Sequence, residues 1–155
     1  MKNFLRYLQS ASPAAYSQLS GKQVGSSAFN SAWKSLARDG SFGDLQHDFI
    51  QQSYYEPALS SIRSSLGIDL SGRSAAVQDA LWSTAVQHGV GGAKTVFRNA
   101  GVTANMSDAE IIRRVYTERG ANNGKKYFPS SSEKVRKGVV SRFRNEMQDA
   151  LNMLR

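Results

Sequence analysis

The sequence predicts an all-α fold with about seven helices and at most a minor β hairpin. Apolar residues recur at helical intervals along most of the chain, and no segment shows the alternation of a strand. Serine, aspartate and glycine stand where helices need caps and stops. The 155 residues, 40% of them hydrophobic, suit one helical domain over residues 1–155.

In the first half of the chain, helices are expected at residues 2–9, 27–38 and 42–66, with a turn or short helix at 13–19. The helix at 27–38 carries Phe29 and Trp33 along one side. Asp39 caps the helix that follows it. Pro57 marks a point where this third helix kinks or splits, because proline has no N–H and its ring clashes with the preceding turn.

In the second half, helices are expected at residues 74–88, 92–100 and 108–119, followed by a last helix that runs to residue 154. Gly89 is well placed as the C′ residue that ends the first of these. Ser107 and Glu110 have the spacing of a capping box. Ser130 and Glu133 repeat that spacing and are expected to open the last helix.

Positive charge is concentrated in the last third. The formal net charge is +8, and residues 111–155 hold 11 of the 20 Lys and Arg but 4 of the 12 Asp and Glu. This pattern favours an anionic partner such as nucleic acid, the bacterial cell wall or an acidic protein surface, although a solvated helix face has the same pattern. The basic residues in question are Arg113, Arg114, Arg119, Lys125, Lys126, Lys134, Arg136, Lys137, Arg142 and Arg144.

Composition and motifs exclude several kinds of site. No apolar run approaches the length of a membrane span, so no membrane insertion is expected. The absence of cysteine excludes disulfides and cysteine zinc sites. Asp44, His47 and Asp48 share one helix face, but no second histidine lies near them, so no metal site is expected. No phosphate loop, dinucleotide fingerprint or Gly-x-Ser-x-Gly turn occurs, so we expect no cofactor and no serine triad.

Two stretches combine glutamine and histidine with aromatic residues. One runs from residue 44 to 57 and the other from residue 78 to 89. Aromatic faces stack on sugar rings, while amides and imidazoles bond hydroxyl and acetamide groups. The pattern therefore indicates a glycan site. The candidate substrate-binding residues are Gln46, His47, Tyr54, Tyr55, Trp82, Gln87 and His88.

Each of these candidates also has a purely structural interpretation. Tyr55 and Trp82 stand at helical spacing, as core residues do. His88 lies at an expected helix C-terminus, where the helix dipole favours a capping histidine. His47 has aspartate neighbours and suits an exposed ion pair.

The order of these pieces resembles a known family. The runs Gln46 to Ile50, Tyr54 to Ala58, Leu66 to Ile68 and Ala76 to Gly89 follow one another in the chain, and Asp108 to Arg119 with the last helix extends the likeness. Over about residues 26–154 they resemble the chitosanases of glycoside hydrolase family 46. They are similar in the same way to the chitosanase-like lysozyme domains of phage tails and type VI secretion effectors.

This resemblance implies a lysozyme-like helical fold and hydrolysis of a β-1,4 bond in an amino sugar polymer such as peptidoglycan. Such hydrolysis uses two carboxyl groups, one to protonate the leaving oxygen and one to activate water or stabilise the sugar cation. The N-terminus has no secretory signal. We therefore expect a soluble protein that a phage or an effector system delivers to the bacterial periplasm or cell wall.

The sequence departs from the family in one respect. The family's catalytic Glu lies on an N-terminal helix, ahead of the region that matches Met1–Leu8 here. Asp44, Asp48 and Glu56 are the acids that a divergent enzyme would recruit, although none of them sits in the family's catalytic context.

Four explanations follow from this departure: a fragment whose catalytic segment or partner protein is supplied elsewhere, a divergent enzyme, a non-catalytic glycan-binding remnant, or an interaction protein on the same scaffold. The first three make the chain a lysozyme-like glycan hydrolase or its substrate-binding portion. The alternative is a module that binds an anionic partner, nucleic acid or acidic protein, through its basic last third. Nucleic acid is the less favoured ligand, because aromatic residues are sparse among these charges and no recognition motif occurs.

Overall fold

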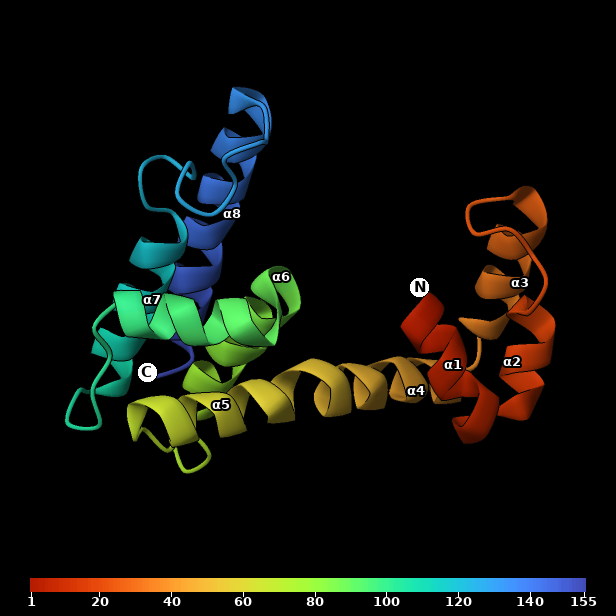
Figure 1. The fold of residues 1–155 in the computed structure, drawn as a ribbon, viewed down its shortest axis with the longest axis horizontal. Helices are drawn as coiled ribbons and strands as arrows, with labels where there is room; N and C mark the ends of the chain where they lie inside the picture. The colour runs from red at the N-terminus through yellow and green to blue at the C-terminus, as the bar shows by residue number, and fades with distance from the viewer. The chain divides into compact units, whose positions relative to one another are not determined.

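The computed structural model describes residues 1–155, and it contains α-helices α1 to α8, one π-helical segment η1 and no β-strand (Figure 1). The prediction of an all-α fold is confirmed, and the minor hairpin that the sequence allowed is absent. The chain forms two compact units, Met1–Ser53 and Tyr54–Arg155, called unit 1 and unit 2 below. None of the helices combines the length and apolar character that a membrane span requires.

Unit 1 is built around an aromatic core. Its helices are α1 (Lys2–Ala11), α2 (Pro13–Leu19), α3 (Ser27–Leu36) and α4 (Gly40–Ile50). Helix α1 packs against α2 and α4, and α2 packs against α3. Phe4 meets Phe42 and Phe49 edge to face, with ring centroids 6.0 and 5.2 Å apart, and Trp33 meets Phe42 in the same way at 5.0 Å. This geometry places the positive edge of one ring on the negative face of the next.

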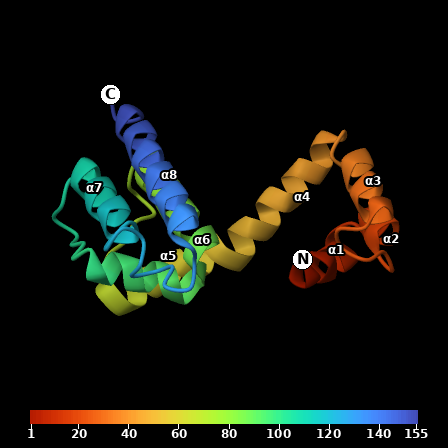
Figure 2. The same cartoon turned by 90° about the horizontal axis from the view of Figure 1, so that it is seen from above.

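Unit 2 has a larger and mainly aliphatic core. Its helices are α5 (Glu56–Leu66), α6 (Ala75–Asn99), α7 (Asp108–Arg119) and α8 (Glu133–Asn152). Helix α6 packs against the other three, and α7 also packs against α8, as Figure 2 shows. Ala76, Ala80 and Ala85 are fully or almost fully buried, which lets neighbouring helices approach α6 closely.

The segment η1 (Gln51–Tyr55) stands where Pro57 predicted an interruption. A proline at position 57 cannot donate to the carbonyl of Ser53, four residues earlier, and its ring crowds that carbonyl. The widened π-helical turn contains Ser53 and so relieves the crowding. The boundary between the two units also falls inside η1.

One predicted helix terminus is confirmed and one differs from the structure. Gly89 ends the first helical stretch of α6 as expected, because its backbone is non-helical (φ 74°, ψ 173°), and a second stretch runs beyond this kink to Asn99. The last helix was expected to open with Ser130 at its N-cap. Instead the hydroxyl of Ser132 accepts from the backbone N–H of Val135, which puts Glu133 in the first turn. The other predicted capping box begins as expected, because the hydroxyl of Ser107 accepts from the N–H of Glu110.

Candidate functional site

The residues predicted to bind substrate fall in both units. Gln46 and His47 lie on α4 of unit 1, together with Asp44 and Asp48. The side-chain amide of Gln46 donates to the carbonyl of Phe42 at 3.3 Å, and the His47 Nδ1 lies 3.6 Å from an Asp48 oxygen at the protein surface. No group of carboxylates and histidines in the structure could hold a metal ion.

The remaining candidates belong to unit 2, where two of them form an aromatic pair. The rings of Tyr55 and Trp82 lie 5.5 Å apart and are tilted by 37°. Both side chains are partly buried, and Tyr55 packs against the hydrophobic core of unit 2. Tyr54 likewise packs on the edge of the core. A ring pair at the rim of a core offers an apolar face to a ligand from solvent.

Gln78 positions the tyrosine of this pair. The Tyr55 hydroxyl donates to the Gln78 Oε1 at 3.2 Å, while the Gln78 Nε2 donates to the carbonyls of Arg73 and Ser71 at 2.9 and 3.2 Å. The amide thus uses both of its ends, so its orientation is fixed. Tyr55 is thereby tied to the loop that precedes α6.

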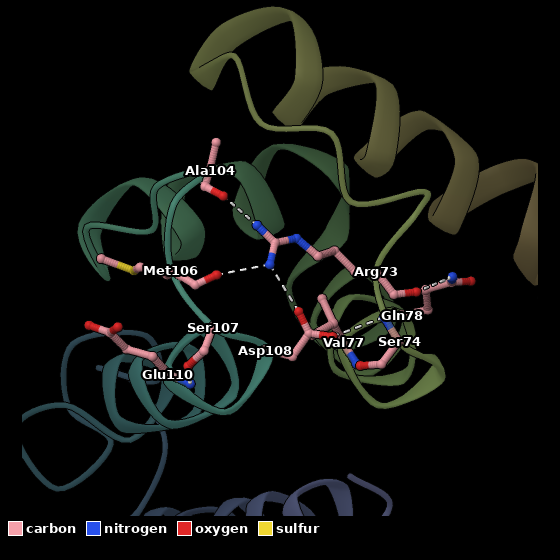
Figure 3. A network of polar contacts seen from close by, with 9 residues as sticks. All are labelled: Arg73, Ser74, Val77, Gln78, Ala104, Met106, Ser107, Asp108 and Glu110. Carbon is pink, nitrogen blue, oxygen red and sulfur yellow. Dashed lines mark hydrogen bonds and ion pairs between the residues drawn. The ribbon is translucent and has the colours of Figure 1, made fainter.

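That loop is itself held by a network around Arg73, which Figure 3 shows. The Arg73 guanidinium donates to the carbonyl of Met106 at 2.8 Å and to the Asp108 carboxylate at 3.0 Å. The other Asp108 oxygen accepts from the N–H of Ser74 at 3.0 Å. The hydrogen bonds from Ser74 and the Arg73 charge hold the pKa of Asp108 below its usual range. The network joins the starts of α6 and α7. It therefore holds in place the loop carbonyls to which Gln78 donates.

The negative charges of two carboxylates act on Tyr55. Burial raises the pKa of Tyr55 above its ordinary value, and the negative charges of Asp79 and then Glu56 raise it further. Both acids are exposed on the surface of unit 2. Glu56 was a sequence candidate for catalysis. Asp79 was not, although it stands in the Gln78–Trp82 run that the sequence singled out. Tyr55, Gln78, Asp79 and Trp82 are called the α6 face below.

Asp79 also lines a hollow between α6, α7 and α8 of about 300 Å³. Its walls hold two further acids, Glu146 and Asp149, so we call it the acidic cleft. The full lining is Asp79, Ser83, Tyr116, Glu146, Asp149, Ala150 and Met153. No local sequence pattern signals this grouping, because α6 and α8 are more than thirty residues apart in the chain.

Glu146, one of the acids that line the cleft, pairs with a buried arginine. Arg119 is 0% exposed, and its guanidinium lies 3.5 Å from Glu146 and 4.0 Å from the centre of the Phe143 ring. The Ser83 hydroxyl donates to Glu146 at 2.7 Å and accepts from Arg119 at 3.1 Å. Arg119 therefore does not belong to the basic surface where the sequence placed it. A charge buried this deeply needs its partner, which ties Glu146 to a structural role.

Gln87 and His88 sit next to this pair. The Gln87 side-chain carbonyl accepts a hydrogen bond from Arg142, which in turn contacts Glu146 at 3.2 Å. The His88 ring lies against Tyr127, with the two centroids 5.3 Å apart. Burial, together with the charges of Arg119 and Arg142, lowers the pKa of His88 to about 4. A neutral imidazole gains little from a helix dipole, so desolvation outweighs the capping role that the sequence suggested.

Comparison with known proteins places this arrangement in a family. A profile of the C-terminal region of type VI secretion system spike proteins like VgrG3 matches residues 1–147, which includes both units. The type VI secretion system spike protein VgrG3 of Vibrio cholerae is 30% identical over 142 residues. The match covers 88% of this chain, which spans 14% of the length of that relative. The chain belongs to the family of VgrG3-like C-terminal domains of type VI secretion system spike proteins.

Proposed function

We propose that this domain binds an amino sugar polymer of the bacterial cell wall along the α6 face, as the substrate-binding portion of a lysozyme-like hydrolase. The observation that carries the proposal is the partly exposed pair of Tyr55 and Trp82, held in place by Gln78. Stacking rings beside amide and carboxylate groups form the mixture that binds sugars.

The acids beside this pair extend the proposal to hydrolysis. Asp79 and Glu56 belong to unit 2 together with this ring pair, their negative charges act on Tyr55, and cleavage of a glycosidic bond requires two carboxyl groups. Glu146 is less suited to this work because Arg119, Arg142 and Ser83 already occupy it. Asp44 and Asp48, the other sequence candidates, lie in unit 1. We therefore assign the general acid and its partner to Glu56 and Asp79.

Membership of the family suggests how the domain would reach its substrate. The matching relative is a spike protein of the type VI secretion system. We propose that the domain reaches the cell wall of a target bacterium as a passenger on such a spike, and that peptidoglycan is the polymer it meets there.

Purified sacculi test binding and hydrolysis together. The protein is incubated with sacculi, and both turbidity and cosedimentation are measured. We expect Trp82→Ala to weaken cosedimentation roughly fivefold, because stacking on a sugar ring contributes on the order of 1 kcal/mol. Tyr16→Ala, which removes a partly buried ring of unit 1, is the matched control and should leave binding unchanged.

The same assay separates the enzyme from the binding module. Clearing that is lost in Glu56→Gln/Asp79→Asn and kept in Asp48→Asn would assign the catalytic acids to unit 2. Cosedimentation without clearing, weakened by Trp82→Ala, would identify a binding module alone. If the wild-type protein neither clears nor sediments with sacculi, the proposed function is wrong.

A further inference from the structure

A second hollow region of unit 2 lies between the loop after α7 and helix α8. Two adjoining hollows of about 420 and 760 Å³ share Asn122, Asn123, Val140 and Arg144 in their walls. We call the region the basic groove. Its basic and amide side chains, called the rim below, are Asn122, Asn123, Lys125, Arg136, Lys137 and Arg144. None of these residues belongs to the α6 face or the acidic cleft.

The rim keeps most of its positive charge available. Glu133 is the one acid in the lining, and it pairs with Lys137 at 2.8 Å. Lys125 and Arg144 form no ion pair, and both are exposed. Unpaired cations around a concave surface raise the local concentration of anions and offer charged hydrogen bonds to carboxylates.

The floor of the groove is apolar. Val140 and Met147 are its partly exposed members, whereas the rings of Tyr116 and Phe143, which also line the smaller hollow, are buried. A nucleic acid strand would bring phosphates to the rim, but its bases would need exposed rings for stacking, and both rings of the floor are buried. An apolar floor with a cationic rim fits a short anionic peptide better, because such a ligand carries both alkyl groups and carboxylates.

The loop that forms the rim is held in an unusual conformation. Asn122, Asn123 and Gly124 take consecutive positive φ values of 54°, 52° and 80°. Asparagine is among the few residues with a side chain that adopt this left-handed region readily, which explains its use at two successive positions here. At Gly124 the reason is packing as well, since a Cβ there would stand 3.3 Å from the Cβ of Arg136 on α8. The loop is thus pressed onto α8 with two asparagine amides at the mouth of the groove.

From these features we infer that the basic groove binds the anionic stem peptide of the cell-wall polymer. The cations would pair with the peptide carboxylates, the asparagine amides with its peptide groups, and the apolar floor with its alkyl side chains. The inference rests on the proposed function, because that proposal identifies the cell-wall polymer as the ligand. It adds a second binding site on the domain and a preference for glycan strands that still carry their peptides.

The test compares two preparations of the polymer. Sacculi are used intact or after an amidase has removed the stem peptides and left bare glycan strands. We expect the wild-type protein to bind intact sacculi about tenfold more tightly, from one or two charged hydrogen bonds in a partly exposed groove. Lys125→Gln/Arg144→Gln should abolish this difference while leaving binding to the bare strands unchanged.

The control removes the same charge elsewhere. Arg98→Gln/Arg113→Gln loses two exposed cations of unit 2 that lie outside the groove, and it should retain the preference for intact sacculi. If the control loses that preference as well, general charge and not the groove explains it, and the inference is wrong. Circular dichroism confirms that all of these proteins are folded.

The outcomes separate this inference from the proposed function. Failure of the wild-type protein to bind either preparation would overturn the proposed function. Equal binding to both preparations, unaffected by the groove substitutions, would overturn only the groove assignment. Binding to duplex DNA at moderate salt that the groove substitutions abolish, with unchanged binding to sacculi, would make the groove a nucleic-acid interface instead.

Discussion

The two units bury different kinds of side chain. Every buried residue of unit 1 is apolar, and phenylalanine rings provide half of them. Unit 2 buries mainly aliphatic residues and alanine, but it also buries Thr84 and Arg119 and encloses the ring of His88. Ring packing depends on shape, whereas a buried charge depends on its partner. We therefore expect unit 1 to be sensitive to lost volume and unit 2 to be sensitive to lost pairing as well.

The largest effect should come from a ring in unit 1. Phe42 is 2% exposed and touches both Phe4 and Trp33, so Phe42→Ala should lower the free energy of unfolding by about 3–5 kcal/mol. Hydrogen exchange followed by mass spectrometry should show lost protection in residues 1–53. Phe97→Ala, at a fully buried ring of unit 2, should produce the reverse pattern. If either variant loses hydrogen-exchange protection equally in both units, the two units unfold as one cooperative core, and the expected difference between them is wrong.

A smaller effect should follow from removing the partner of Arg119. Glu146→Gln leaves a buried guanidinium without its carboxylate, and it should lower the free energy of unfolding by about 2–3 kcal/mol, since Glu146 itself is partly exposed. Replacing both partners, as in Arg119→Met/Glu146→Gln, should restore much of this loss. Chemical denaturation gives the free energy of unfolding of the wild type, the single variant and the double variant. A single substitution that shifts stability by less than about 0.5 kcal/mol would contradict the prediction.

The smallest effect should be the pH dependence that His88 contributes. Its pKa is about 4 in the folded protein against 6.5 in its ordinary state, so the unfolded chain binds the proton more readily. The free energy of unfolding therefore has its full value with respect to His88 above pH 6.5, and it decreases as the pH falls from 6.5 to 4. After a discount for partial exposure this decrease is on the order of 2 kcal/mol.

His88→Phe tests this by comparing free energies of unfolding at several pH values. The difference between wild type and variant should change between pH 6.5 and 4 in favour of the variant as the pH falls. His47→Gln, which replaces the exposed histidine of unit 1, should follow the wild-type curve. A constant difference between wild type and His88→Phe would contradict the expected sign and size.

The helices were predictable because their signals are local. Periodicity placed the apolar faces, and single residues such as Ser107 and Asp39 marked helix starts within a turn. The break at Gly89 was predictable as well, because glycine is the residue that adopts a positive φ without strain. The start of α8 at Ser132 was ambiguous, because three consecutive serines precede Glu133.

The candidate site was predictable only in part. Tyr55 and Trp82 do lie together at a partly exposed position. Arg119 was placed on the surface because arginine is rarely buried. Its spacing from Ile112 and Tyr116 nevertheless puts it on the buried face of α7, a signal that helical periodicity contains. The acidic cleft and the basic groove could not be predicted from the sequence. Both depend on which turns of distant helices face each other, and that is not a local property.

The way the helices begin has a consequence for acid tolerance. Five helices start with a serine hydroxyl that accepts a backbone N–H, at Ser12, Ser26, Ser74, Ser107 and Ser132, and only α4 is capped by an acid, Asp39. A hydroxyl has no proton to gain as the medium acidifies, so these five starts keep their hydrogen bonds as the pH falls. Acid would then loosen the domain at a few identifiable points, such as His88 and Asp108, before it unwinds the helices themselves.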